Sequence, residues 1–146
     1  MRRSIGPVKP TAVAGKRKKR LVAMCSELPA AVAAAVGLEN EHLVLKVRGK
    51  SFGYYAFDHH GDGRIALHCK AAPGEQGRLV EEDPKRFFVP PYLGKNGWLA
   101  VRLDGAKVDW SEIAYLLRTA YRLSAPKSLV AKLEERTIIA PSRRER

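Results

Sequence analysis

The chain has 146 residues, of which 45% are hydrophobic and 29% are charged, and its formal net charge is +12. This length fits one globular domain with its own hydrophobic core, and no apolar run approaches the roughly 18 residues that a membrane span needs. Because no apolar segment with a cleavage site follows the N-terminal arginines, we expect a cytoplasmic protein with no membrane contact.

The positive charge is concentrated at the two ends of the chain. Residues 1–20 carry a net charge of +8 and residues 141–146 carry +2, which leaves +2 for residues 21–140. A basic segment attracts phosphates whatever it is attached to, and the same composition is typical of a solubilising tail. We predict three parts: a basic disordered arm (residues 1–19), a single domain (residues 20–138) and a basic C-terminal tail (residues 139–146).

The first ordered segment has a helical pattern. Apolar residues from Leu21 to Val32 share one helical face, which predicts a helix over residues 20–36. Pro29 breaks or restarts this helix, because proline lacks the amide hydrogen that a helix interior uses.

Residues 39–70 change to the two-residue period of a β-strand. Within residues 43–47 the leucines and Val47 fall on one face while Lys46 falls on the other, which predicts a half-buried strand. The aromatic and β-compatible segments 51–57 and 64–70 flank a polar turn, DHHGDG. These three segments predict an antiparallel meander.

The second half of the chain returns to helices after one more strand. We predict a short helix over residues 73–84 and a strand over residues 97–103. Asp109 and Glu112 form a capping box that starts an amphipathic helix, and residues 127–136 form a last helix. This order predicts an α+β domain with two layers, a mostly antiparallel sheet and helices packed on one of its faces.

No residue pattern nominates a catalytic centre. Gly49-Lys50-Ser51 lacks the earlier glycine of a phosphate-binding loop. Pro126 blocks the helical turn that would bring Lys127 beside Ser124 for acyl transfer. We therefore expect a protein that is not an enzyme, with an enzyme of an unrecognised type as a third alternative.

Two further groups fail as metal sites. In Asp58-His59-His60-Gly61-Asp62 neighbouring side chains point apart, so we interpret this segment as a solvated hairpin tip rather than a metal site. His68 beside Cys69 meets the same objection. We expect Cys25 and Cys69 to be reduced and buried, since the sequence shows no secretory signal.

Cations with aromatic neighbours are the candidates for binding. Lys46, Arg48 and Lys50 would form a row about 7 Å apart, close to the phosphate repeat of a nucleic-acid strand, although ordinary solvated sheet faces have the same pattern. Tyr92 and Trp98 can stack on bases, but a tryptophan in such a loop is more often a core anchor. The candidate nucleic-acid-binding residues are Lys16, Arg17, Lys18, Lys19, Arg20, Lys46, Arg48, Lys50, Lys85, Arg86, Tyr92, Lys95 and Arg102.

Four segments carry a resemblance to a known family: VRGKSF (47–52), RFFVPPYLGKNGWLAVRL (86–103), DW (109–110) and AYRLSAPK (120–127). In this order they resemble the MmcQ/YjbR family of small bacterial proteins. The resemblance implies a compact frataxin-like (CyaY-like) α+β domain and a DNA-binding function, with no catalytic residues. Frataxin-like iron binding does not follow, because frataxins use an acidic first helix and residues 20–36 hold a single acid, Glu27.

We therefore expect a non-enzymatic DNA-binding protein that uses no cofactor or metal. Its phosphate contacts would come from the basic arm and from a basic sheet and loop face. The alternative is a protein-interaction or small-ligand-binding module whose loop lines a pocket, and the small net charge of residues 21–140 fits it equally well. We expect a monomer rather than an obligate oligomer.

Overall fold

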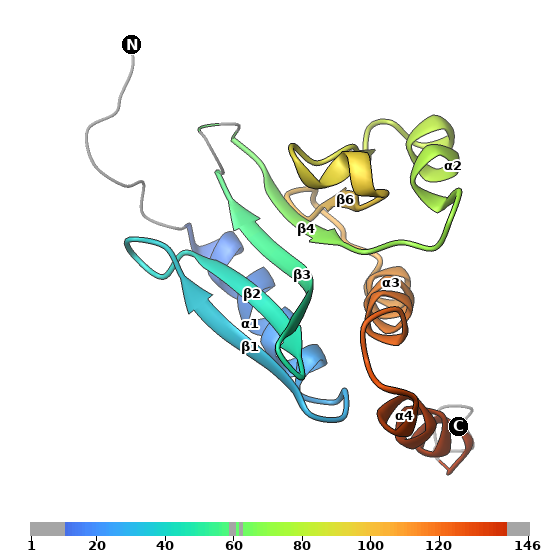
Figure 1. Ribbon diagram of the computed structural model, residues 1–146. Coiled ribbons are helices and arrows are strands. Elements are labelled where there is room, and N and C mark those ends of the chain that lie inside the picture. The colour runs from blue at the N-terminus through green and yellow to red at the C-terminus, as the bar shows by residue number, and fades with distance from the viewer. Residues whose placement is uncertain (1–10, 59–60, 62, 140–146) are drawn as a thin grey trace.

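Figure 1 shows the computed structural model of the chain, which describes residues 11–58, 61 and 63–139. None of the helices in this part of the chain is long and apolar enough to cross a membrane. In chain order the elements are α1 (Ala12–Cys25), β1 (Ala31–Val36), β2 (His42–Val47), β3 (Lys50–Phe57), β4 (Ile65–Cys69), α2 (Glu75–Glu82), β5 (Phe87–Phe88), the 3-10 helix η2 (Leu93–Asn96), β6 (Leu99–Arg102), α3 (Trp110–Arg122) and α4 (Lys127–Ile139).

Six strands form one antiparallel sheet in the order β1-β2-β3-β4-β6-β5. Helix α1 lies behind β1, β2 and β3, and α3 packs against β3 and β4 (Figure 1). The predicted α+β class with a mostly antiparallel sheet is therefore confirmed. We call the sheet face that packs against α1 and α3 the helix face, and the opposite face the open face.

A row of buried side chains crosses the helix face from strand to strand. Leu43 pairs with Tyr55, Tyr55 with Leu67, and Leu67 with Val101. All four are almost completely buried, and burying each aliphatic side chain stabilises the fold by about 1.5–3 kcal/mol. The Tyr55 hydroxyl donates to the Ala14 carbonyl oxygen at 2.9 Å, which fixes α1 on the sheet.

The predicted helix over residues 20–36 is wrong in its second half, and its start is earlier than predicted. Helix α1 begins at Ala12, where the Thr11 hydroxyl accepts a hydrogen bond from the Ala14 amide at 3.1 Å. The helix ends at Cys25, and the alanine-rich segment beyond Pro29 forms β1, because pairing along all of β2 overrides the helix propensity of alanine.

The boundaries of the predicted basic arm and tail change accordingly. Residues 12–19, which we expected to be disordered, are helical, and Ala14 is completely buried. Residues 1–10 and 140–146 lie outside the described residues. At the C-terminal end α4 continues to Ile139, three residues beyond the predicted helix.

The remaining helices and strands agree with the sequence pattern. The Asp109 carboxylate caps α3 by accepting from the Glu112 amide at 3.2 Å. The short strand β5 and the 3-10 helix η2 have no counterpart in the predicted elements, since two and four residues are too few to show a period.

Both cysteines are unpaired and buried, as expected. Burial raises the pKa of Cys25 to about 11 and that of Cys69 to about 12. Both thiols are therefore poor nucleophiles, because the thiolate is the reactive form.

Candidate functional site

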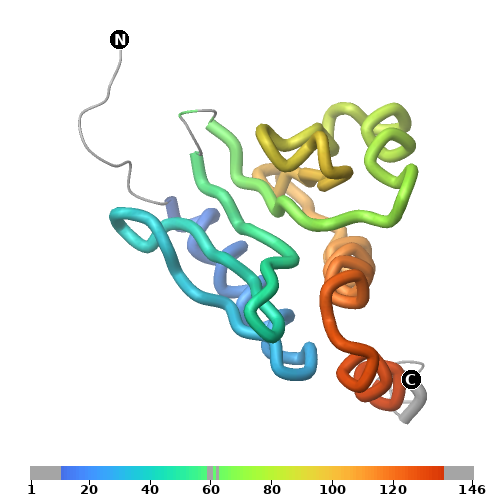
Figure 2. The backbone as a smooth tube through the Cα atoms, viewed as in Figure 1, coloured from blue at the N-terminus to red at the C-terminus, as the bar shows by residue number. Residues whose placement is uncertain are grey.

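Residues 89–98 fold over the open face of the sheet. The ring of Trp98 stacks on that of Tyr54, with a centroid distance of 5.6 Å and an interplanar angle of 30°. Tyr54 points to the open face because its neighbour Tyr55 points to the helix face. Trp98 is 7% exposed, so it is a core anchor, as its type suggested. Figure 2 shows this yellow part of the backbone beside α2.

Helix α2 holds this loop in place through one side chain. The amide nitrogen Nε2 of Gln76 donates to the carbonyl oxygen of Gly94 at 2.8 Å and to that of Trp98 at 2.6 Å. Nothing in the sequence distinguishes Gln76 from other polar helix residues. The contact depends on tertiary structure alone.

The backbone of the loop is held in uncommon conformations. Gly97 has a φ of 86°, a conformation that favours glycine, whereas Gly94 is needed because a Cβ atom there would lie 2.2 Å from Cγ1 of Val89. Tyr92 has φ 66° and ψ −54°, and the Leu93 amide donates to the Pro91 carbonyl at 2.6 Å. This is a classic γ-turn, a rare and strained conformation for a residue with a side chain.

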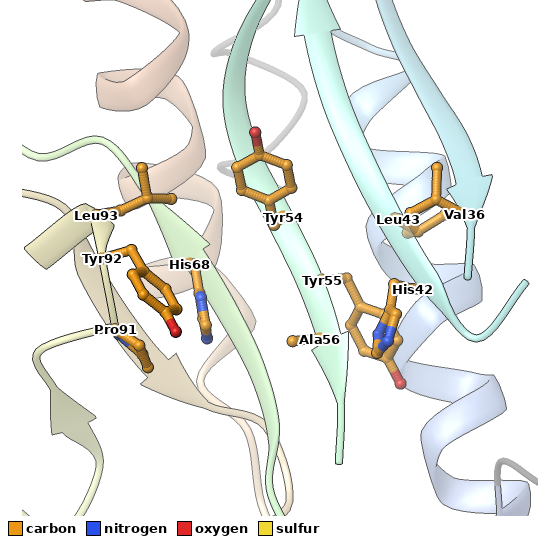
Figure 3. A pocket seen from close by; sticks show the side chains of 10 residues that line it. All are labelled: Val36, His42, Leu43, Tyr54, Tyr55, Ala56, His68, Pro91, Tyr92 and Leu93. Carbon is orange, nitrogen blue, oxygen red and sulfur yellow. The ribbon is translucent and has the colours of Figure 1, made fainter. Parts of the chain in front are cut away.

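Beneath Tyr92 the open face contains a pocket of about 260 Å³. Figure 3 shows Pro91, Tyr92 and Leu93 on one side of it, with Val36 and His42 on the other. Its remaining lining residues are Leu43, Tyr54, Tyr55, Ala56 and His68. Leu43 and Tyr55 turn their side chains to the helix face, so the polar side chains among the others are those of His42, Tyr54, His68 and Tyr92.

The two histidines of the pocket are held by the sheet. His42 accepts a hydrogen bond at Nδ1 from the Phe57 amide at 3.1 Å, and its Nε2 lies 3.4 Å from Oε2 of Glu41. Since Nδ1 accepts, the proton of the neutral imidazole is on Nε2. His68 is 7% exposed and packs edge-on against Phe88, with the ring centroids 5.9 Å apart.

Three of the five candidate cations in α1 have structural contacts. Arg17 donates to the carbonyl oxygens of Leu103 at 2.9 Å and Gly105 at 3.0 Å, and Lys18 donates to the Asn40 carbonyl. The guanidinium of Arg20 lies 4.8 Å from the centre of the Trp110 ring. These contacts tie α1 to distant loops.

Two further candidates have carboxylate partners. Arg86 bonds Glu112 at 2.6 Å and Asp83 at 2.7 Å, and these bonds, that to Glu112 above all, raise its pKa. Arg102 bonds Asp104 at 2.9 Å. Both arginines are thereby less available to a phosphate.

The predicted row of Lys46, Arg48 and Lys50 does not form. Arg48 and Gly49 have φ values of 50° and 82°, and together they make the two-residue turn between β2 and β3. Lys50 therefore begins the next strand opposite Val47, while Lys46 lies on the open face opposite Ser51. The row requires one strand that continues from Lys46 to Lys50, but the turn ends β2 at Val47.

The other candidate cations are exposed but lie on separate elements. Lys16 and Lys19 are on α1, Lys85 precedes β5, and Lys95 is in η2. Tyr92 is 77% exposed at the mouth of the pocket.

A cluster of positive charge does form at the C-terminal end of α3; we call it the basic end and define it as Arg48, Lys50, Lys70 and Arg136. Burial raises the pKa of Tyr121, near that end of α3, and the charges of Arg136 and Arg48 oppose this rise. Burial and then the charge of Lys50 lower the pKa of Lys70.

Hydrogen bonds hold two of the four cations of the basic end in place. Lys70 donates from Nζ to Oγ of Ser124 at 2.8 Å, and Arg136 donates to the Glu27 carbonyl oxygen at 2.6 Å. The sequence did not single out Lys70 or Arg136, because their partners are distant in the chain. Ser124 is 54 positions from Lys70, and Glu27 is 109 positions from Arg136.

Among the described residues, no three His, Cys, Asp or Glu side chains gather in a way that could hold a metal ion. His59, His60 and Asp62 of the predicted hairpin tip lie outside the described residues.

An antiparallel sheet with α1 and α3 on one face and an ordered loop on the other defines a two-layer α+β protein. The family model described as YjbR matches residues 26–123, and the chain belongs to the YjbR family. The chain is also similar to the crystal structure of Deinococcus radiodurans protein DR2400, which has the family domain DUF419. The identity is 27%, the TM-score is 0.60, and the match covers 80% of this chain and 87% of that one. Comparison with curated proteins found no match.

Proposed function

We propose that this protein is a non-enzymatic, cytoplasmic DNA-binding protein whose phosphate contacts come from the basic end. The observation that carries the proposal is the arrangement of charge there. Among the described residues, neither Lys50 nor Lys70 forms an ion pair with a carboxylate, and the charge of Lys50 acts on Lys70 and, after burial, lowers its pKa. A polyanion would relieve this repulsion.

The chemistry of the basic end suits phosphate rather than a base edge. Lysine ammonium groups bind phosphate as point charges, and the arginine fork of Arg48 adds directed donors. The expected binding is therefore electrostatic, independent of DNA sequence and strongly dependent on salt.

The test is a titration of fluorescent duplex DNA by anisotropy at several salt concentrations. In the first variant Arg48, Lys50 and Lys70 are all replaced by Gln; the control replaces Lys85, Lys95 and Lys107 by Gln and has the same net charge. Each phosphate contact contributes about 0.9 to the slope of log affinity against log salt, so the first variant should lose about 3 of that slope. Equal losses in the two variants, or no loss in the first, would refute the basic end as the interface.

The N-terminal arm is tested by deleting residues 1–10. This deletion removes Arg2, Arg3 and Lys9 and should weaken binding to duplex DNA, because it removes three positive charges and leaves every described helix and strand in the chain. A longer deletion would be misleading, since it removes Ala14, whose carbonyl holds Tyr55. Unchanged affinity after the short deletion would exclude these three cations from the interface.

A further inference from the structure

We propose that the pocket on the open face binds a planar heteroaromatic ring, which stacks against Tyr92. This site is separate from the basic end, and the proposal does not depend on DNA binding there.

The pocket exists because one small residue lies between large ones. Ala56 of β3 pairs with Ala66 of β4, so two methyl groups occupy adjoining positions of the open face. Two residues away on the same face, Tyr54 of β3 pairs with His68 of β4, and both of these larger side chains line the pocket. The volume of about 260 Å³ is just below the roughly 300 Å³ at which ligand pockets begin, so it suits one or two fused rings.

The lining combines aromatic surface with hydrogen-bonding groups. Tyr54 is held by its stack on Trp98, which gives the pocket a rigid end. The imidazoles of His42 and His68 add polar ring edges to the lining, with Nδ1 of His42 bonded to the Phe57 amide, while Pro91 and Leu93 add apolar surface. An apolar slot with a few polar groups favours a flat ring that carries nitrogen or oxygen atoms at its edge over a purely aliphatic ligand.

Tyr92 has an unusual backbone conformation for a residue that lines a pocket. Its γ-turn is strained, yet its ring is 77% exposed and gains little from burial in the protein. Strain of this kind persists only where the surrounding structure enforces it, and it is common at ligand sites. Here Gln76 and Gly94 enforce it by fixing the loop on α2. The result is an exposed aromatic ring at the mouth of an aromatic pocket (Figure 3).

Such a ring could reach the pocket as a free small molecule or as an unpaired base of a single strand. Two probes distinguish these sources: 2-aminopurine riboside, and a single-stranded oligothymidine that contains one 2-aminopurine. The fluorescence of 2-aminopurine falls when its ring stacks on another ring. Quenching of the riboside indicates a free ligand, and quenching of the oligonucleotide alone indicates a base delivered by a strand.

The variants Ala56→Leu and Tyr92→Ala test the site itself. Ala56→Leu fills the pocket and should abolish quenching of whichever probe the native protein binds. Tyr92→Ala should weaken binding about five- to 150-fold, which corresponds to the loss of one stacking partner. The matched control is Tyr115→Ala, since Tyr115 is a half-exposed tyrosine on α3, and it should bind like the native protein.

The proposal is overturned if the native protein quenches neither probe, or if Ala56→Leu quenches as well as the native protein. Thermal unfolding of Ala56→Leu shows whether this variant is folded. If it is not, Tyr92→Ala decides the question, because removing an exposed ring leaves the core intact. Equal binding by Tyr92→Ala and Tyr115→Ala would then overturn the proposal.

Discussion

Replacing Gln76 by Ala should destabilise the loop that covers the open face. The substitution removes two hydrogen bonds, to the carbonyl oxygens of Gly94 and Trp98, at 2.8 Å and 2.6 Å. A hydrogen bond contributes about 0.5–1.5 kcal/mol net, so the pair contributes about 2 kcal/mol. The freed entropy of the side chain offsets part of this, which leaves an expected loss of about 1–2 kcal/mol in the free energy of unfolding.

Urea unfolding followed by tryptophan fluorescence measures this loss. Gln76→Glu is the informative second variant, because a carboxylate of the same length cannot donate to either carbonyl and places acceptors against acceptors. We expect it to be at least as destabilising as Gln76→Ala at neutral pH. If both variants unfold within about 0.3 kcal/mol of the native protein, Gln76 does not hold the loop, and the account of the strained Tyr92 loses its support.

Two further predictions concern packing and pH. Gly94→Ala should cost about 1–3 kcal/mol of stability in urea unfolding, because the new Cβ meets Val89, whereas Gly77→Ala in the open part of α2 should be neutral or stabilising; equal effects would contradict the packing argument. The hydrogen bond from Arg86 lowers the pKa of Asp83, so this ion pair stabilises the fold above the ordinary aspartate pKa of about 3.9 and is lost as pH falls through the lowered value. Between pH 5 and pH 2, roughly the interval over which a lowered carboxylate pKa acts, the free energy of unfolding of Asp83→Asn should therefore fall less than that of the native protein. An identical fall in the two proteins would contradict this prediction.

The sequence predicted the central strands well because their burial alternates strictly. Leu43, Leu45 and Val47 are buried and Lys46 is exposed, as the two-residue period requires. The same reasoning failed for β1, whose alanines have no period and favour a helix when neighbours are ignored. The edge position of β1 and its pairing with β2 decide its conformation, and neither is visible in a single sequence.

Charge was the least predictable property of the candidate site. A sequence shows that Arg17 and Arg86 are cationic, but only the fold shows that Arg17 bonds carbonyl groups of a distant loop and that Arg86 bonds Glu112. Conversely, Lys70 belongs to the basic end, although the residues around it in the sequence do not indicate this. The pocket was missed for a similar reason, because Ala56 is notable only beside the larger residues around it.

The way α2 is attached has a consequence for the dynamics of the molecule. Leu79 is the buried residue of α2, so this short helix has little apolar surface holding it to the rest of the protein. Because the loop depends on Gln76, the two segments should open together, at a lower free energy than global unfolding. Amide hydrogens of residues 93–98 should then exchange with solvent at the same rate as those of α2, and a ligand in the pocket should slow both.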